Sequence, residues 1–162
     1  MTIIDYSLLA LKIVTAVGCG LVAGVFFGFS TFVMNALGRL QPPQGIAAMQ
    51  SINITAINPL FMTAIFGTGA VCLFWTVFSL LNWHEASSAY LLAGSLLYLY
   101  GTVIVTILVN VPLNDALATV DPASAEGANL WIKYLAEWTL WNHARTIAPL
   151  VSAIFFTLAL RF

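Results

Sequence analysis

The chain has 162 residues, of which 61% are hydrophobic and 7% are charged, whereas charged residues make up roughly a quarter of an ordinary soluble domain. Its formal net charge is −1, which excludes the strongly basic surface that binds nucleic acid. We therefore expect an integral membrane protein whose partner is the lipid bilayer. Residues 1–162 are too few to add a separate soluble module, so they are expected to form a single domain.

Four apolar stretches are long enough to cross a bilayer, whose ~30 Å hydrocarbon core requires about 20 helical residues. In chain order they are Tyr6–Leu37, Pro59–Leu81, Ser88–Val109 and Trp138–Leu160. The short connections between them predict an all-α membrane protein, a bundle of four transmembrane helices that runs up-down-up-down with both termini on the same side.

The connections carry signals for the ends of these helices. Asn58-Pro59 combines a capping side chain with a proline at the first helical position, which favours a helix start. Pro112 is expected to end the third span, because a proline disfavours helical backbone in the residue before it. Asp121 precedes a proline and predicts the start of the last helix, which then runs into the membrane. The moderately polar segment Gln44–Asn58 predicts a short helix at the membrane interface, between the first two spans.

Small residues recur every four positions in the first span, at Gly20, Gly24 and Gly28. This spacing creates a smooth helix face that a neighbouring backbone can approach closely. The sequence leaves open whether that neighbour belongs to the same bundle, to a second copy of the chain or to another protein of a membrane complex.

The densest group of polar side chains is W-T-L-W-N-H-A-R at Trp138–Arg145, where the last span enters the membrane. About 20 residues counted back from the end of this span place Arg145 about four residues, or ~6 Å, inside. Arg145 shares a helical face with Trp138, Trp141 and Asn142. It is either an anchor that reaches the interface or a functional charge, and we favour the functional charge. The two tryptophans form either an interfacial belt or a stacking wall.

Further polar residues gather at the same end of the predicted bundle. Seven of the eight asparagines belong to it: Asn35, Asn53, Asn58, Asn110, Asn114, Asn129 and Asn142. Asparagine supplies donors and acceptors together, so this end suits the polar feature of a mostly apolar ligand. Asp115 stands beside Asn114 as a candidate partner for Arg145.

His143 points about 100° away from Asn142 around the helix. It is therefore either a hydrogen-bonded structural histidine or a base that titrates near neutral pH. No metal site is expected, because His84 and His143 belong to opposite membrane ends and no ligand pair has a recognisable spacing.

Four motifs are distributed over nearly the whole chain: G-V-F-F-G-F-S-T-F-V-M (Gly24–Met34), Q-G-I-A-A-M-Q-S-I-N (Gln44–Asn53), N-V-P-L-N-D (Asn110–Asp115) and W-T-L-W-N-H-A-R (Trp138–Arg145). Together they resemble the anthrone oxygenase-like family of integral membrane proteins. That family contains many small bacterial proteins of unknown function beside fungal members that oxidise anthrones to anthraquinones. The resemblance implies a location in the bacterial inner membrane. One departure is Asn35, where the pattern V-M-P-A-L has proline.

The resemblance implies oxygen chemistry without a bound cofactor, on a flat lipophilic ketone such as an anthrone. Loss of an acidic methylene proton from such a molecule gives a carbanion that can pass an electron to O₂. The protein then supplies a base, donors for the developing oxyanion and a dry aromatic pocket. The implied donors are Arg145, Asn110, Asn114 and Asn142, the implied base is His143 or Asp115, and the implied substrate contacts are Trp138, Trp141, Asn35 and Asn58.

Two other functions remain open at this point. The same pocket could bind a lipophilic molecule such as a quinone without turning it over. Alternatively, the chain is a structural or assembly subunit whose face of Gly20, Gly24 and Gly28 docks a partner. A transporter is disfavoured, because the four spans contain no repeat pair and no helix broken at the midplane.

Overall fold

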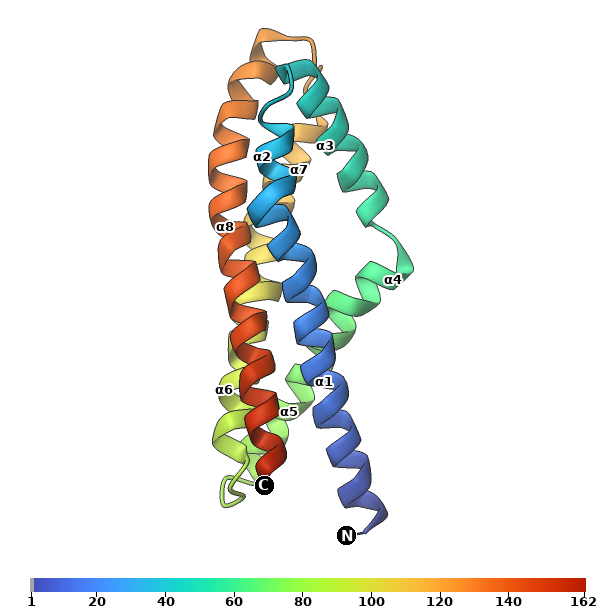
Figure 1. Ribbon diagram of the computed structural model, residues 1–162, viewed down its shortest axis with the longest axis vertical. Coiled ribbons are helices and arrows are strands. Elements are labelled where there is room, and N and C mark those ends of the chain that lie inside the picture. Colours follow the sequence, from blue (N-terminus) through green and yellow to red (C-terminus); the bar gives the residue numbers. More distant parts are fainter. Residues whose placement is uncertain (1) are drawn as a thin grey trace.

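The structure is a computed structural model that describes residues 2–162, and these residues form helices and turns without a strand. Four helices are long and apolar enough to cross a membrane: Ile3–Leu37, Pro59–Leu81, Ser88–Ala118 and Ala125–Arg161. They run up-down-up-down, and both termini lie at the same end of the bundle (Figure 1). The predicted fold class is confirmed.

Three of the four spans contain π-helical turns, in which the backbone hydrogen bonds reach back five residues rather than four. The first span consists of α1 (Ile3–Gly28), a π-helical segment (Phe29–Val33) and α2 (Met34–Leu37). The second consists of α4 (Pro59–Met62), a π-helical segment (Thr63–Gly67) and α5 (Thr68–Leu81). The third consists of α6 (Ser88–Tyr98), π-helical segments at Leu99–Ile104 and Thr106–Asn110, and α7 (Val111–Ala118). The fourth is α8 (Ala125–Leu158), followed by a 3₁₀ turn (Ala159–Arg161).

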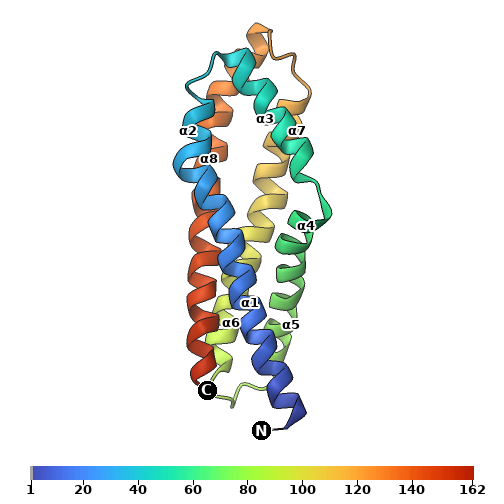
Figure 2. The same cartoon turned by 45° about the vertical axis from the view of Figure 1, so that its right-hand side comes forward.

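The helix between the first two spans is α3 (Pro42–Ala56), which agrees with the short helix expected at Gln44–Asn58. Figure 2 shows it at the end of the bundle opposite the termini, descending obliquely toward α4. Asn58 caps α4 as expected, because its Oδ1 accepts a hydrogen bond from the Phe61 N–H at 3.0 Å. The last helix begins at Ala125, three residues beyond the predicted Asp121-Pro122 start, because the Ser124 hydroxyl caps it.

The third span does not end before Pro112, and this prediction was wrong: the helix continues to Ala118. The Val111 N–H donates to the Thr106 carbonyl, five residues back. This π-type bond shifts the hydrogen-bond register directly before Pro112, so the helix passes a residue that has no N–H to donate. The additional turns of α7 bring Asn114 and Asp115 onto the helix itself.

The bundle has two hydrophobic cores, one above the other. The termini-side core is centred on Trp75, Tyr98 and Phe156, and it also holds the two buried free cysteines, Cys19 and Cys72. The burial of both cysteines confirms that they act as small hydrophobic residues. The α3-side core contains Met34, Leu37, Ile46, Met49, Leu117, Trp131, Tyr134 and Trp138. The long helix α8 contributes to both.

The small-residue face of the first span does not pack inside the bundle. Gly20 and Gly24 are exposed, and a Cβ atom built on either would meet nothing within 4 Å. At Gly28 a Cβ atom would meet only the ring of Phe32, one turn further along the same helix. The face therefore points outward and is open to lipid or to another helix.

Candidate functional site

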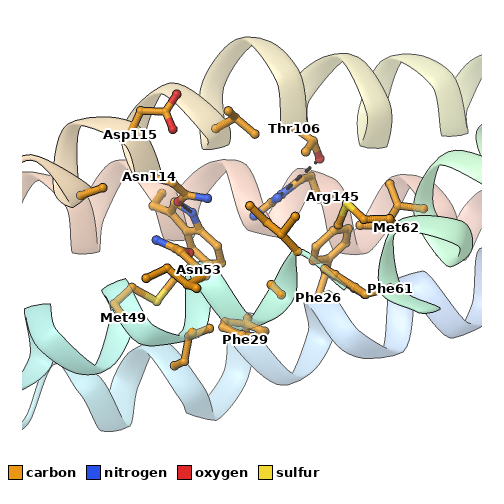
Figure 3. A pocket seen from close by; sticks show the side chains of 18 of the residues that line it. Phe26, Phe29, Met49, Asn53, Phe61, Met62, Thr106, Asn114, Asp115 and Arg145 are labelled. Atoms are coloured by element: carbon orange, nitrogen blue, oxygen red, sulfur yellow. Dashed lines mark hydrogen bonds between the residues drawn. The ribbon is translucent and has the colours of Figure 1, made fainter. Parts of the chain in front are cut away.

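A cavity of about 460 Å³ lies between the two cores, within the size range of small-molecule sites. Figure 3 shows its walls, which come from the first span, α3, α4, the third span and α8. Most of the lining side chains are aliphatic or aromatic, and a few polar groups converge among them, as in ligand pockets generally. The polar members are Gln50, Asn53, Thr106, Asn114, Asp115 and Arg145.

Arg145 is the charged group inside this cavity, and its side chain is only 4% exposed. Its guanidinium carbon lies 4.4 Å from the centre of the Phe26 ring and 4.8 Å from the centre of the Trp138 ring. Aromatic rings attract a cation at this distance through their negative faces. Nη2 donates to Asn142 Oδ1 at 2.9 Å, and Nη1 lies 3.5 Å from the Thr106 hydroxyl.

Among the described residues, no carboxylate is paired with Arg145. Among residues 2–162 the single ion pair joins Lys133 to Glu137 at 3.9 Å, and both of these side chains are exposed. Asp115 lines the same cavity, but its oxygens are more than 4 Å from the guanidinium, and the Arg145 Nε is buried without a hydrogen-bond partner. A buried charge without a counter-charge is costly, so the cavity offers an unused place for an anion or a developing negative charge.

Asn142 holds Arg145 in place. Its side chain is completely buried, and Nδ2 donates at 2.8 Å both to the Phe26 carbonyl and to the Ser30 hydroxyl. The amide oxygen is thereby directed toward Arg145. Thr146, one turn later on α8, also contacts the Ser30 hydroxyl, at 3.0 Å. Asn142 does not line the cavity, so its position suits it to orient the arginine rather than to contact a ligand.

Asn114 and Asn110 are both close to Trp138, but only Asn114 lines the cavity. Its Oδ1 accepts two hydrogen bonds, from the Tyr134 hydroxyl at 2.7 Å and from the Trp138 indole nitrogen at 2.8 Å. Asn110 is completely buried, and its Nδ2 donates to the Trp138 carbonyl at 3.2 Å. Asn110 therefore fixes the distance between the third span and α8.

Four of the predicted site residues lie elsewhere. His143 and Trp141 are exposed on α8, while Asn35 and Asn58 are exposed on other helices and bond to their own local backbone. At about 100° per residue, Trp141 is rotated roughly 50° from the centre of the face that carries Trp138 and Arg145. Its side chain is 42% exposed and does not line the cavity, so the expectation that it joins Trp138 and Arg145 there was wrong, although the spacing of four residues allowed it.

The wall formed by α3 was missed from the sequence. Met49, Gln50 and Asn53 line the cavity, and the Asn53 Nδ2 atom is buried without a hydrogen-bond partner. The segment reads as a moderately polar helix, and only the tertiary fold shows that one of its faces closes a cavity. The motif that ends at Asn53 was the available signal, because it belongs to the family resemblance.

The cavity lies close to the surface of the membrane. Lys133 and Glu137, in the first half of α8, and Asp115, on α7, are exposed charges, which hydrocarbon does not accommodate. Arg145 follows Glu137 by eight residues, or about 12 Å along the helix. The cavity thus extends from an exposed carboxylate at its mouth to a buried cation inside the apolar bundle.

Fold and cavity together define a four-helix membrane protein with a mostly apolar cavity between its spans. The chain matches the family model described as anthrone oxygenase over residues 59–155, more than half of its length, and it belongs to that family. The matched part contains Asn114, Asp115, Trp138 and Arg145. No curated protein and no solved structure matches the chain.

Proposed function

We propose that the protein is a cofactor-independent oxygenase of the bacterial inner membrane, acting on a lipophilic aromatic ketone such as an anthrone. The observation that carries the proposal is Arg145: a buried guanidinium, without a carboxylate partner, facing an aromatic cavity. A hydrogen-bonded cation in a mostly apolar cavity is well suited to stabilise negative charge as it develops on an oxygen.

In the proposed reaction the substrate places its carbonyl toward Arg145 and its methylene group toward the mouth. A base removes one methylene proton, and the resulting anion is delocalised onto the carbonyl oxygen, where Arg145 stabilises it. The electron-rich carbon then transfers electrons to O₂ and forms a carbon–oxygen bond. Overall, one methylene group and one O₂ become one carbonyl group and one water.

Asp115 is the proposed base. It lines the cavity and is exposed, so its carboxylate can take a proton and exchange it with solvent. His143 is exposed outside the cavity, and for this reason it loses the role that the sequence left open to it. The Trp138 ring lines the same cavity and offers a flat surface to the substrate.

The substrate is proposed to enter from the membrane. Ile54 and Ile57, at the end of α3 and in the turn before α4, line the cavity and are largely exposed, at 74% and 76%. Side chains of this kind are compatible with lipid at the rim. A lipid-soluble ketone would then reach Arg145 without crossing water.

Oxygen consumption by the purified protein in nanodiscs, with anthrone as the substrate, tests the proposal. Arg145→Gln should lower the enzyme-dependent rate by about 10²-fold or more, whereas Arg39→Gln, which removes an exposed cation at the same end, should leave it unchanged. An equal rate in wild type and Arg145→Gln would overturn the proposal. Tight binding of anthrone without oxygen uptake would instead establish a non-catalytic binder.

A further inference from the structure

Asn114 has an amide whose orientation is fixed by its neighbours. The indole nitrogen of Trp138 can only donate a hydrogen bond, so the Asn114 atom 2.8 Å away from it must be the oxygen. The Tyr134 hydroxyl donates to the same oxygen at 2.7 Å. With both bonds on the oxygen, the NH₂ group is held on the opposite side of the amide.

The Asn114 NH₂ group is left free for a ligand. Within residues 2–162 no protein atom accepts a hydrogen bond from it, and Asn114 lines the cavity together with Arg145. Figure 3 shows the Asn114 side chain reaching from its helix into the space that Asn53 and Arg145 also face. The cavity thus has a second donor, distinct from the guanidinium.

Tyr134 does not line the cavity and cannot contact a ligand there. Its side chain is completely buried, and its ring is stacked between two others, 5.6 Å from Trp131 and 6.0 Å from Trp138, centre to centre. The stacking therefore holds the Tyr134 ring in place, with its hydroxyl directed at the Asn114 oxygen. The stack gives Asn114 a rigid support.

We infer that Tyr134 is a positioning residue that, together with Trp138, holds the Asn114 NH₂ group as a fixed donor, and that the ligand carries two acceptor oxygens. One oxygen faces Arg145 and the other faces Asn114. The inference deepens the proposed function, on which it rests: aromatic molecules with two separated oxygen functions, such as hydroxyketones and diketones, should bind more tightly than unsubstituted anthrone.

The test is a binding series with three molecules of nearly the same shape: anthracene, anthrone and anthraquinone, which carry no, one and two oxygens. Binding to the full chain in nanodiscs is measured under nitrogen against empty nanodiscs, so that partition into lipid cancels. For wild type, the affinity should rise about tenfold from anthracene to anthrone and about tenfold again from anthrone to anthraquinone. Each of these two steps corresponds to one additional hydrogen bond in the cavity.

Asn114→Asp is the discriminating variant. The new side chain still accepts from Tyr134 and Trp138 but has no NH₂ group, so the step from anthrone to anthraquinone should disappear while the melting temperature stays close to that of wild type. Tyr134→Phe keeps the ring stack and removes one of the two bonds, so that step should shrink to about threefold. Tyr98→Phe is the matched control, because it removes an equally buried hydroxyl that donates to the Ile65 carbonyl, and it should keep the full step.

A purely structural role of Tyr134 would weaken the three ligands equally and leave their ratios unchanged, which would overturn the inference. Equal affinities of wild type for anthrone and anthraquinone would overturn it as well. Because the assay contains no oxygen, its result is independent of turnover. A protein that shows both steps but consumes no oxygen with anthrone would refute the proposed oxygenase and leave the fixed donor in place.

Discussion

The termini-side core and the cavity are built from the same four spans, yet they differ in the kind of polar group that is left without a partner. In the termini-side core the Trp75 indole donates to the Thr15 hydroxyl at 3.0 Å and the Tyr98 hydroxyl donates to the Ile65 carbonyl at 2.9 Å. In that half the buried Ser79 and Ser95 hydroxyls have no partner, whereas beside the cavity the unpaired atoms include the Arg145 Nε and the Asn53 Nδ2. Because a charged group without a full set of partners is costlier to bury than a hydroxyl, this difference supports the proposal that the cavity binds a ligand.

The largest expected effect comes from the mouth of the cavity. Asp115→Asn removes the proposed base, and the rate of anthrone-dependent oxygen uptake should fall by about 10²- to 10⁴-fold. Glu126→Gln changes an exposed carboxylate at the same end of the bundle that does not line the cavity, and it should have no effect. Equal rates for both variants would show that Asp115 is not the base.

Arg145→Met should make the protein more stable while it abolishes activity. The substitution removes a buried charge that lacks a carboxylate, and the expected gain is about 1–4 kcal/mol, measured as a higher melting temperature in detergent. Lys12→Met is the comparison in the termini-side half, where the Lys12 ammonium donates to the Ala159 carbonyl at 3.2 Å. That variant should not gain stability. A lower melting temperature for Arg145→Met would mean that the guanidinium is a structural element.

Substitution of one tryptophan in each region compares the cavity with the termini-side core directly. Trp138→Phe and Trp75→Phe each remove one indole hydrogen bond, to Asn114 and to Thr15 respectively, and each should cost about 1–2 kcal/mol of stability. Only Trp138→Phe should also reduce oxygen uptake, by about tenfold, because it releases the Asn114 amide. If Trp75→Phe reduced uptake equally, activity would be following general stability instead of the cavity.

The smallest effect is expected for His143. Its side chain is exposed on α8, away from the cavity, so His143→Ala should change oxygen uptake by less than about twofold, as is usual for surface substitutions. A large loss of activity, with a normal melting temperature, would restore His143 as the candidate base.

The fold could be predicted from the sequence because the bilayer imposes simple requirements on length and polarity. Stretches such as Pro59–Leu81 have the bounds expected, since they depend on local composition and on caps such as Asn58. The end of the third span could not be predicted, because the passage through Pro112 depends on a π-type bond just before it. Rules based on residue type and spacing do not describe such a change in the hydrogen-bond register of a helix.

The site was predictable in part. Arg145, Trp138 and Asn114 could be found because charged, aromatic and amide side chains are conspicuous in an apolar chain. The roles of Asn53 and Tyr134 could not be found, since they depend on the packing of α3 and on a ring stack inside the bundle. Helical spacing alone also failed to separate Arg145 from Trp141, because it does not say where the centre of the buried face lies.

An experimental structure of the protein with anthraquinone bound in nanodiscs tests the central claim, that the cavity beside Arg145 is the ligand site. The account predicts flat density between Phe26 and Trp138, with one oxygen within hydrogen-bond distance of the Arg145 guanidinium and the other facing the Asn114 amide. Ligand density at another place, or a cavity closed by a carboxylate paired with Arg145, would contradict it.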